Sequence, residues 1–103
     1  MIRHTIMWKF TDEFEKMDKQ QIMERVKNGL TSLVGVVPGL KNASVEPDVL
    51  HSERSYDMIY ISEFESMEAL EAYQSNPDHL RIAGFIRQVR TAQAVTDTVI
   101  EDR

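Results

Sequence analysis

The sequence contains no cysteine, and this absence excludes disulfide bonds, thiol catalysis and thiolate metal sites. Glycine is also scarce, with four residues in 103, and no glycine-rich phosphate loop is present. No stretch approaches the ~20 apolar residues that a membrane span needs. The first residues lack the apolar run of a secretory signal peptide. We therefore expect a cytoplasmic protein without a membrane partner.

Positive charge is scarce in the second half of the chain, where no lysine follows Lys41. The formal net charge is −5, and residues 52–103 carry all of the deficit, with five arginines against ten acidic residues. An acidic surface repels phosphate backbones, so we expect no nucleic-acid partner. The acid-rich stretch from Glu63 to Glu71 is interpreted as a solvated face. We expect no metal and no cofactor, since no motif for either is present.

Apolar periodicity predicts one α+β domain over residues 1–103. Alternating apolar residues predict strands, and apolar residues at three- and four-residue spacing predict helices. Pro47 favours an edge strand, and Asn76-Pro77 separates two helices. The expected elements are strand 2–10, helix 18–35, strand 41–50, strand 56–65, helix 67–75, helix 77–90 and strand 92–100. This βαββαβ order, with the second helix in two pieces, predicts a ferredoxin-like antiparallel sheet with helices on one face.

The uncovered face of such a sheet predicts a homodimer. Thr5, Met7, Ile59 and Ile61 would share that face and form an apolar patch on the central strands. Two sheets packed back to back would bury both patches. The alternative is an open, half-polar face, since Glu63 and other polar residues also lie there.

His79 is the first candidate for proton-transfer chemistry. It follows the predicted N-cap residue Asn76 by three positions and shares a helical stripe with Ile82 and Ile86. The helix dipole and burial among apolar groups both favour a neutral imidazole. A neutral ring near pH 7 can act as a base or as a proton donor. The alternative is a core histidine with satisfied hydrogen bonds and no catalytic task.

Four other inward-facing residues are candidates for the same site. His4 is the polar exception on an apolar strand face and needs a partner, because an unpaired buried polar group costs about 1–3 kcal/mol. Tyr73 lies on a buried stripe, and its hydroxyl could meet a histidine in a proton relay or reach the surface. Trp8 and Tyr60 are interpreted as the aromatic wall of a pocket or, alternatively, as core residues.

Three segments have the order and spacing of motifs that occur together in one family. Arg3-His4-Thr5-Ile6-Met7-Trp8-Lys9-Phe10 is similar to a KHxxxxKF opening, and Val37-Pro38-Gly39-Leu40 is similar to an IPG junction. Residues 64–79, FESMEALEAYQSNPDH, are similar to the pattern FxSxEALxxYxxHPxH. By these segments the chain resembles the stress-responsive dimeric α/β-barrel (Dabb) family. One departure is Asn76, where the family often has a histidine.

The resemblance implies a homodimer whose two sheets form a barrel, with a cavity in each subunit between sheet and helices. Similarity to the plant polyketide cyclases implies acid–base roles for His79 and Tyr73, with His4 lining the cavity. The ligand would be a small apolar molecule with a phenol or carbonyl group. Its other expected contacts are Ile6, Trp8, Tyr60, Met67 and Ile82.

Three functional hypotheses remain open at this point. In the first, the protein is a cofactor-independent cyclase, lyase or isomerase, or a binding protein; His79 moves a proton, Tyr73 holds the substrate oxygen and His4 orients the substrate. In the second, His79 ligates iron as in haem-degrading monooxygenases of the same barrel fold, whose Asn–Trp–His pattern is not matched here in position. In the third, the chain is a non-catalytic stress or interaction module whose cavity is filled by side chains.

Overall fold

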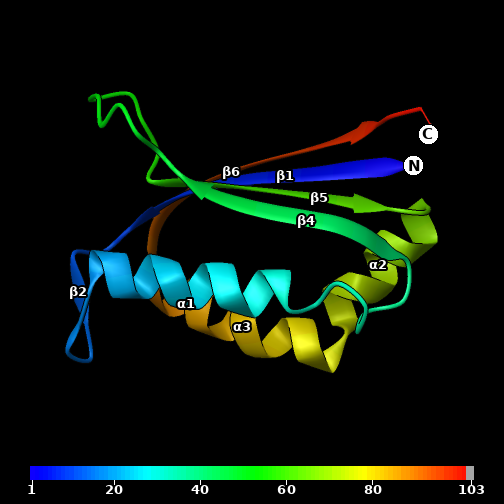
Figure 1. The fold of residues 1–103 in the computed structure, drawn as a ribbon, viewed down its shortest axis with the longest axis horizontal. Coiled ribbons are helices and arrows are strands. Elements are labelled where there is room, and N and C mark those ends of the chain that lie inside the picture. The colour runs from blue at the N-terminus through cyan, green and yellow to red at the C-terminus, as the bar shows by residue number, and fades with distance from the viewer. Residues whose placement is uncertain (102–103) are drawn as a thin grey trace.

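A four-stranded antiparallel sheet is covered on one face by helices in the computed structural model, which describes residues 1–101 (Figure 1). The strands are β1 Ile2–Phe10, β2 Glu13–Phe14, β3 Met17–Asp18, β4 Leu40–Pro47, β5 Met58–Phe64 and β6 Arg90–Val99. The helices are α1 Lys19–Thr31, α2 Met67–Ser75 and α3 Pro77–Val89. The sheet order is β4-β5-β1-β6, and β2 pairs with β3 in a separate hairpin. The predicted ferredoxin-like α+β class is confirmed.

The helices begin at the residues that the sequence indicated. Asp18 caps α1 in a capping box with Gln21, and Asn76 caps α3 by accepting a hydrogen bond from the Asp78 amide. Helix α1 ends earlier than predicted, at Thr31. The apolar spacing continues beyond this end because Leu33 and Val37 are buried in the turns that follow. Within residues 1–101, no helix combines the length and apolar character that crossing a bilayer requires.

The hairpin of β2 and β3 was not predicted. Its turn contains Glu15 and Lys16, which both have positive φ angles of 46° and 69°. Tight hairpins usually place asparagine, aspartate or glycine in such positions, so the sequence carries no turn signal there. Phe14 of the hairpin packs edge-on against Phe85 of α3, with ring centroids 6.2 Å apart. This contact places the hairpin against one end of the helical layer.

The inward face of β1 builds the core, as predicted. Ile2, Trp8 and Phe10 are buried together with His4. In the neighbouring strand β5, Ser62 pairs with His4 and donates a hydrogen bond to its carbonyl oxygen at 3.3 Å. Polar groups therefore lie inside the core at this point, beneath the helices.

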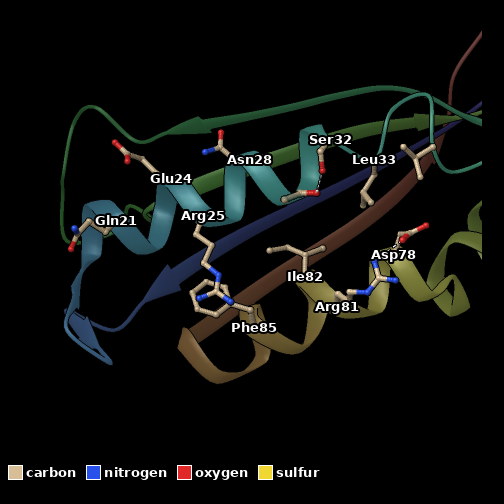
Figure 2. A pocket seen from close by; sticks show the side chains of 12 residues that line it. Gln21, Glu24, Arg25, Asn28, Ser32, Leu33, Asp78, Arg81, Ile82 and Phe85 are labelled. Atoms are coloured by element: carbon tan, nitrogen blue, oxygen red, sulfur yellow. Dashed lines mark hydrogen bonds and ion pairs between the residues drawn. The ribbon is translucent and has the colours of Figure 1, made fainter.

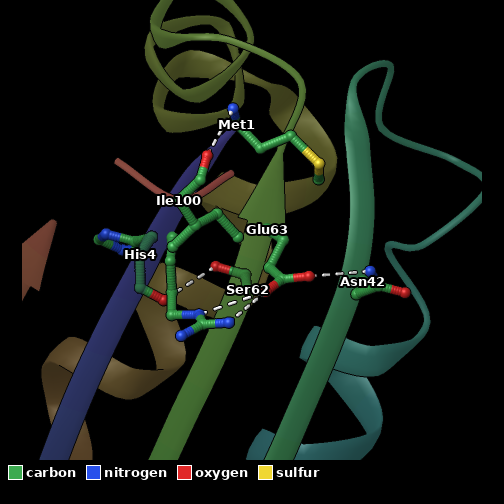
Figure 3. Close-up of polar contacts among 7 residues, drawn as sticks. Met1, His4, Asn42, Ser62, Glu63 and Ile100 are labelled. Carbon is green, nitrogen blue, oxygen red and sulfur yellow. Dashed lines mark hydrogen bonds and ion pairs between the residues drawn. The ribbon is translucent and has the colours of Figure 1, made fainter. Parts of the chain in front are cut away.

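The outer face of the sheet, which no helix covers, combines an apolar centre with a polar network. Thr5, Met7, Ile59 and Ile61 are half-buried there and face one another across β1 and β5. Arg3, Glu63 and Asn42 extend a polar network across three strands (Figure 3): Arg3 donates to Glu63 at 2.8 Å, and Asn42 donates to Glu63 at 3.0 Å. An apolar surface on central strands is the feature that predicted a second copy.

Two glycines have opposite structural roles. Gly39 precedes β4 with a φ of +82°, and a Cβ atom there would lie 2.5 Å from the Cβ of Ala69 in α2. Gly84 lies within α3, and a Cβ atom there would meet nothing within 4 Å. The first glycine is required by backbone geometry and close packing, whereas the second only lowers helix propensity.

We expect Gly39→Ala to lower the free energy of unfolding by about 1–3 kcal/mol, because alanine is strained at positive φ and meets Ala69. We expect Gly84→Ala to raise it by about 0.5–1 kcal/mol, because alanine restricts the unfolded chain and favours the helix. Urea unfolding at equilibrium measures both values. A Gly39→Ala protein as stable as the Gly84→Ala protein would contradict this account.

Candidate functional site

A cavity of about 250 Å³ lies between the inward face of the sheet and helix α3. His4, Tyr73 and His79 all line it, and so do Ile6, Trp8 and Tyr60. Pockets for drug-sized ligands usually measure about 300–1,000 Å³, so this cavity suits a smaller molecule. The structure thus brings the three proton-transfer candidates from β1, α2 and α3 into one enclosure.

Two residues expected to contact a ligand lie elsewhere. Met67 begins α2 and is 48% exposed, outside the cavity. Ile82 turns toward α1, where its Cδ1 atom lies 2.5 Å from the position that a Cβ atom on Gly29 would occupy. Ala83 and Ile86 line the cavity instead. Some apolar residues of α3 face α1 and others face the cavity. Their spacing in the sequence does not show which residue faces which neighbour.

His79 lies in the first turns of α3 with its Nδ1 atom buried and without a hydrogen-bond partner in the described part of the chain. Burial lowers the pKa of His79 below 6.5; the carbonyl groups of Gln74 and Tyr73 raise it in part, and nearby His4 lowers it further. The ring is therefore neutral at pH 7. The same ring lines the cavity together with His4 and Tyr73, so a neutral imidazole borders the space that a ligand would occupy.

The hydroxyl groups of Tyr60 and Tyr73 form a buried hydrogen bond of 2.8 Å. Burial raises the pKa of Tyr73, and the neighbouring Tyr60 raises it further; burial also raises the pKa of Tyr60. Both phenols thus stay protonated at neutral pH and act as donors. Tyr73 meets His79 through its ring, with centroids 4.0 Å apart, and not through its hydroxyl. The direct Tyr–His relay considered from the sequence is absent between these two side chains.

The partner that buried His4 needs is Asp97. The two residues face each other across β1 and β6, and His4 Nδ1 lies 2.5 Å from Asp97 Oδ1. A carboxylate only accepts hydrogen bonds, so His4 Nδ1 is the donor and this contact fixes the orientation of the ring. Sequence reasoning missed Asp97. It lies two residues after Val95 in the last predicted strand, so the alternation already placed both side chains on the inward face.

A second polar group lies at the other end of the cavity. Gln93 Oε1 accepts hydrogen bonds from Trp8 Nε1 at 3.0 Å and from an Arg90 guanidinium nitrogen at 2.5 Å. Arg87 of α3 joins Arg90 in the cavity lining. Sequence reasoning missed these residues. Gln93 and Arg90 lie far from Trp8 in the sequence, and only the pairing of β6 with β1 brings them beside it.

A larger, open groove of about 810 Å³ runs between α1 and α3 on the outside of the helical layer (Figure 2). Arg25 extends over the ring of Phe85 at 3.9 Å, and Arg81 pairs with Asp78 at 2.6 Å. These charges already have partners, and neither histidine of the core reaches the groove. The smaller cavity is therefore the better candidate for chemistry.

The cavity does not fit haem. An unpaired imidazole nitrogen is a possible iron ligand. A porphyrin, however, is larger than most drug-sized molecules, and about 250 Å³ is too small to hold it. The monooxygenase hypothesis is therefore not carried forward.

Comparison with known proteins identifies the family and the fold. A family model described as "Stress responsive A/B Barrel Domain" matches residues 2–100. No curated protein sequence matches the chain significantly.

Solved structures share the fold over nearly the whole chain. A dimeric protein of unknown function with a ferredoxin-like fold from Bacteroides fragilis is 17% identical, with a TM-score of 0.84 and coverage of 96% of this chain and 95% of that one. A protein from Arabidopsis thaliana is 23% identical, with a TM-score of 0.80 and coverage of 100% and 98%. A hydroxynitrile lyase from Passiflora edulis is 14% identical, with a TM-score of 0.80 and coverage of 99% and 94%. At these identities the likeness shows the fold alone.

We expect the NMR titration of the His79 ring to have its midpoint below pH 6.5, with His79→Gln used to assign the resonance. Because the unfolded chain binds this proton at higher pH than the folded protein, His79 favours folding above pH 6.5. That contribution is lost as the pH falls through the lower, folded value. Urea midpoints should accordingly decline less in His79→Gln than in the wild type between pH 7 and pH 5. A midpoint at or above 6.5 would refute the neutral, desolvated ring.

Proposed function

The chain belongs to the stress-responsive A/B barrel domain (Dabb) family, and on this premise we propose that it binds a small, mostly apolar carbonyl or phenolic molecule beneath α3 and moves a proton on it. The observation that carries the proposal is the placement of the His79 ring, which has a lowered pKa, in the lining of that cavity together with His4 and Tyr73. The cavity has an open volume of about 250 Å³. This favours a ligand-binding protein over a non-catalytic interaction module, in which side chains would fill the cavity.

His79 is the proposed base. A neutral imidazole at pH 7 accepts a proton without first losing one, and its lowered pKa keeps it in that form. It takes the proton from a carbon beside a carbonyl, and the electron pair of the C–H bond moves onto the carbonyl oxygen. If the enolate is conjugated with a further double bond, return of the proton to the far carbon completes an isomerisation. Alternatively, the enolate carbon attacks a second carbonyl within the same molecule and closes a ring, and the proton held by His79 passes to the new alkoxide oxygen.

The paired tyrosines are the proposed donors to the developing negative oxygen. The two hydroxyl groups carry two hydrogens and the bond between them uses one, so the other can donate to Ser62 or to a ligand oxygen. In a site with little water, a donor already oriented toward the carbonyl oxygen stabilises the negative charge that develops in the transition state more than it stabilises the neutral substrate. His4, held in one orientation by Asp97, orients the substrate on the opposite wall.

A lyase is a second form of the same chemistry. The Passiflora edulis neighbour is described as a hydroxynitrile lyase, and a cyanohydrin is a small polar-headed molecule of suitable size. Here the base would take the hydroxyl proton, the carbon–carbon bond to cyanide would break, and its electrons would leave with cyanide. The products are a carbonyl compound and hydrogen cyanide once the proton is returned.

We expect proton transfer to depend on His79. The assays are α-hydrogen exchange of phenylacetone in D₂O, followed by NMR, and benzaldehyde release from mandelonitrile, followed by absorbance. On a compound that the wild type turns over, His79→Gln should lower kcat by about 10²–10⁴-fold, and Tyr73→Phe by about 10²-fold, because a base and an oxyanion donor are removed.

The matched control is His51→Gln, since His51 lies outside the cavity with its side chain 79% exposed. Its rates should equal those of the wild type. Full turnover in His79→Gln, or no turnover of either compound by the wild type, would count against the proposed chemistry.

We also propose that two copies associate through the outer face of the sheet. A structural neighbour is described as dimeric, and the half-buried Met7, Ile59 and Ile61 form the apolar centre of that face. Burial of two such faces against each other removes this surface from water.

Ile61→Glu should therefore convert a dimer into a monomer, because it would bury an unpaired carboxylate at the centre of the contact. Sedimentation velocity measures the change. Val36→Glu is the control, since Val36 is 57% exposed in the turn after α1 and away from the sheet. A monomeric wild type, or equal dissociation of both variants, would contradict the proposed interface.

A further inference from the structure

The cavity has a second polar end, distant from His79. Arg87 lies eight residues after His79 on α3, which corresponds to about 12 Å along the helix at a rise of ~1.5 Å per residue. Along the sheet, His4 and Trp8 lie four residues apart on β1, which corresponds to about 13 Å. Arg90 is held beside Trp8 through Gln93. The two ends are therefore separated along one axis of the same cavity.

The charge at this second end is not neutralised. Within residues 1–101, no ion pair joins Arg87 or Arg90 to an acidic side chain. Glu15 lines a neighbouring surface hollow with Arg87 but makes no ion pair with it. The partner of Arg90 is the neutral amide of Gln93, which positions the guanidinium and leaves its charge free. Arg87 and Arg90 are both exposed to solvent and both line this end of the cavity, so an anion entering there would meet two guanidinium groups.

Guanidinium groups bind carboxylate and phosphate oxygens through charge-assisted hydrogen bonds. We propose that Arg87 and Arg90 form a subsite for an oxyanion group of the ligand, so that the cavity takes an elongated apolar molecule with a carboxylate or phosphate at one end. Ile6, Ile86 and Val95 line the apolar middle. The inference rests on the proposed function for the His79 end, where the reactive carbon of such a molecule would lie.

The net negative charge of the protein repels anions from most of its surface. Only a local positive potential at the cavity, created by the two arginines, offsets this repulsion. Anion binding should therefore weaken as ionic strength rises, whereas binding of an equally apolar neutral molecule should not.

Trp8 reports on binding, because it is the one tryptophan of the chain and lines the cavity. Three probes of matched apolar length are titrated against its fluorescence: 4-phenylbutyrate, 4-phenylbutyl phosphate and the neutral 4-phenylbutyramide. We expect at least one of the anions to bind tenfold or more tightly than the amide. Whichever anion binds more tightly identifies the source of the oxyanion, carboxylate or phosphate.

The preference should disappear in the Arg87→Gln/Arg90→Gln double variant, with the affinity for the amide unchanged. Arg87→Gln alone should lose part of the preference, and it leaves the contact of Arg90 with Gln93 and Trp8 intact. Arg81→Gln is the control, because Arg81 lies on the same helix but pairs with Asp78 outside the cavity. It should bind all three probes as the wild type does.

The outcomes separate this inference from the proposed function. Equal binding of the amide and both anions to the wild type, the same loss of preference in Arg81→Gln, or no binding of any probe would overturn the oxyanion subsite. An anion preference that persists in a His79→Gln protein with full turnover would leave the subsite standing and remove the proposed base.

Discussion

The close packing of α1 against α3 decides where the helical layer lies over the sheet. Gly29 has no side chain, and Ile82 occupies the space that one would fill. This contact holds α3 toward α1 and leaves the inward side of the edge strand β6 poorly covered, where Val95 is 48% exposed and Val99 is 82% exposed. The cavity lies under α3 beside β6, so it follows from how closely the two helices approach each other.

Burial then sets the chemistry of the cavity. The same desolvation that lowers the pKa of His79 raises the pKa of Tyr60 and Tyr73, because in each case the charged form is disfavoured. At neutral pH this leaves an uncharged base beside two uncharged donors. His4 differs, because Asp97 lies against it at the more open β6 edge and fixes its orientation. An uncharged base beside uncharged donors is the arrangement on which the proposed proton transfer depends.

The fold was largely predictable because its signals are local. Alternation over residues 2–10, the capping box at Asp18 and the Asn76-Pro77 junction each constrain the backbone of their own segment. The end of α1 and the β2–β3 hairpin were not predicted. Leu33 and Val37 keep apolar spacing beyond the helix, and the hairpin turn uses Glu15 and Lys16 where glycine or asparagine is expected.

The sequence by itself determined the class of fold, the inward faces of the strands and three candidates for proton transfer that line one cavity: His4, Tyr73 and His79. These follow from periodicity and side-chain chemistry, which depend on near neighbours in the chain. Only the tertiary structure decided that Ile82 faces α1, that Tyr73 pairs with Tyr60 and that Asp97 pairs with His4. It also decided that Gln93 and the two arginines border the cavity. The physical reason is that strand register and helix packing join residues far apart in the chain, such as His4 and Asp97, which are 93 positions apart, and no local pattern encodes those pairings.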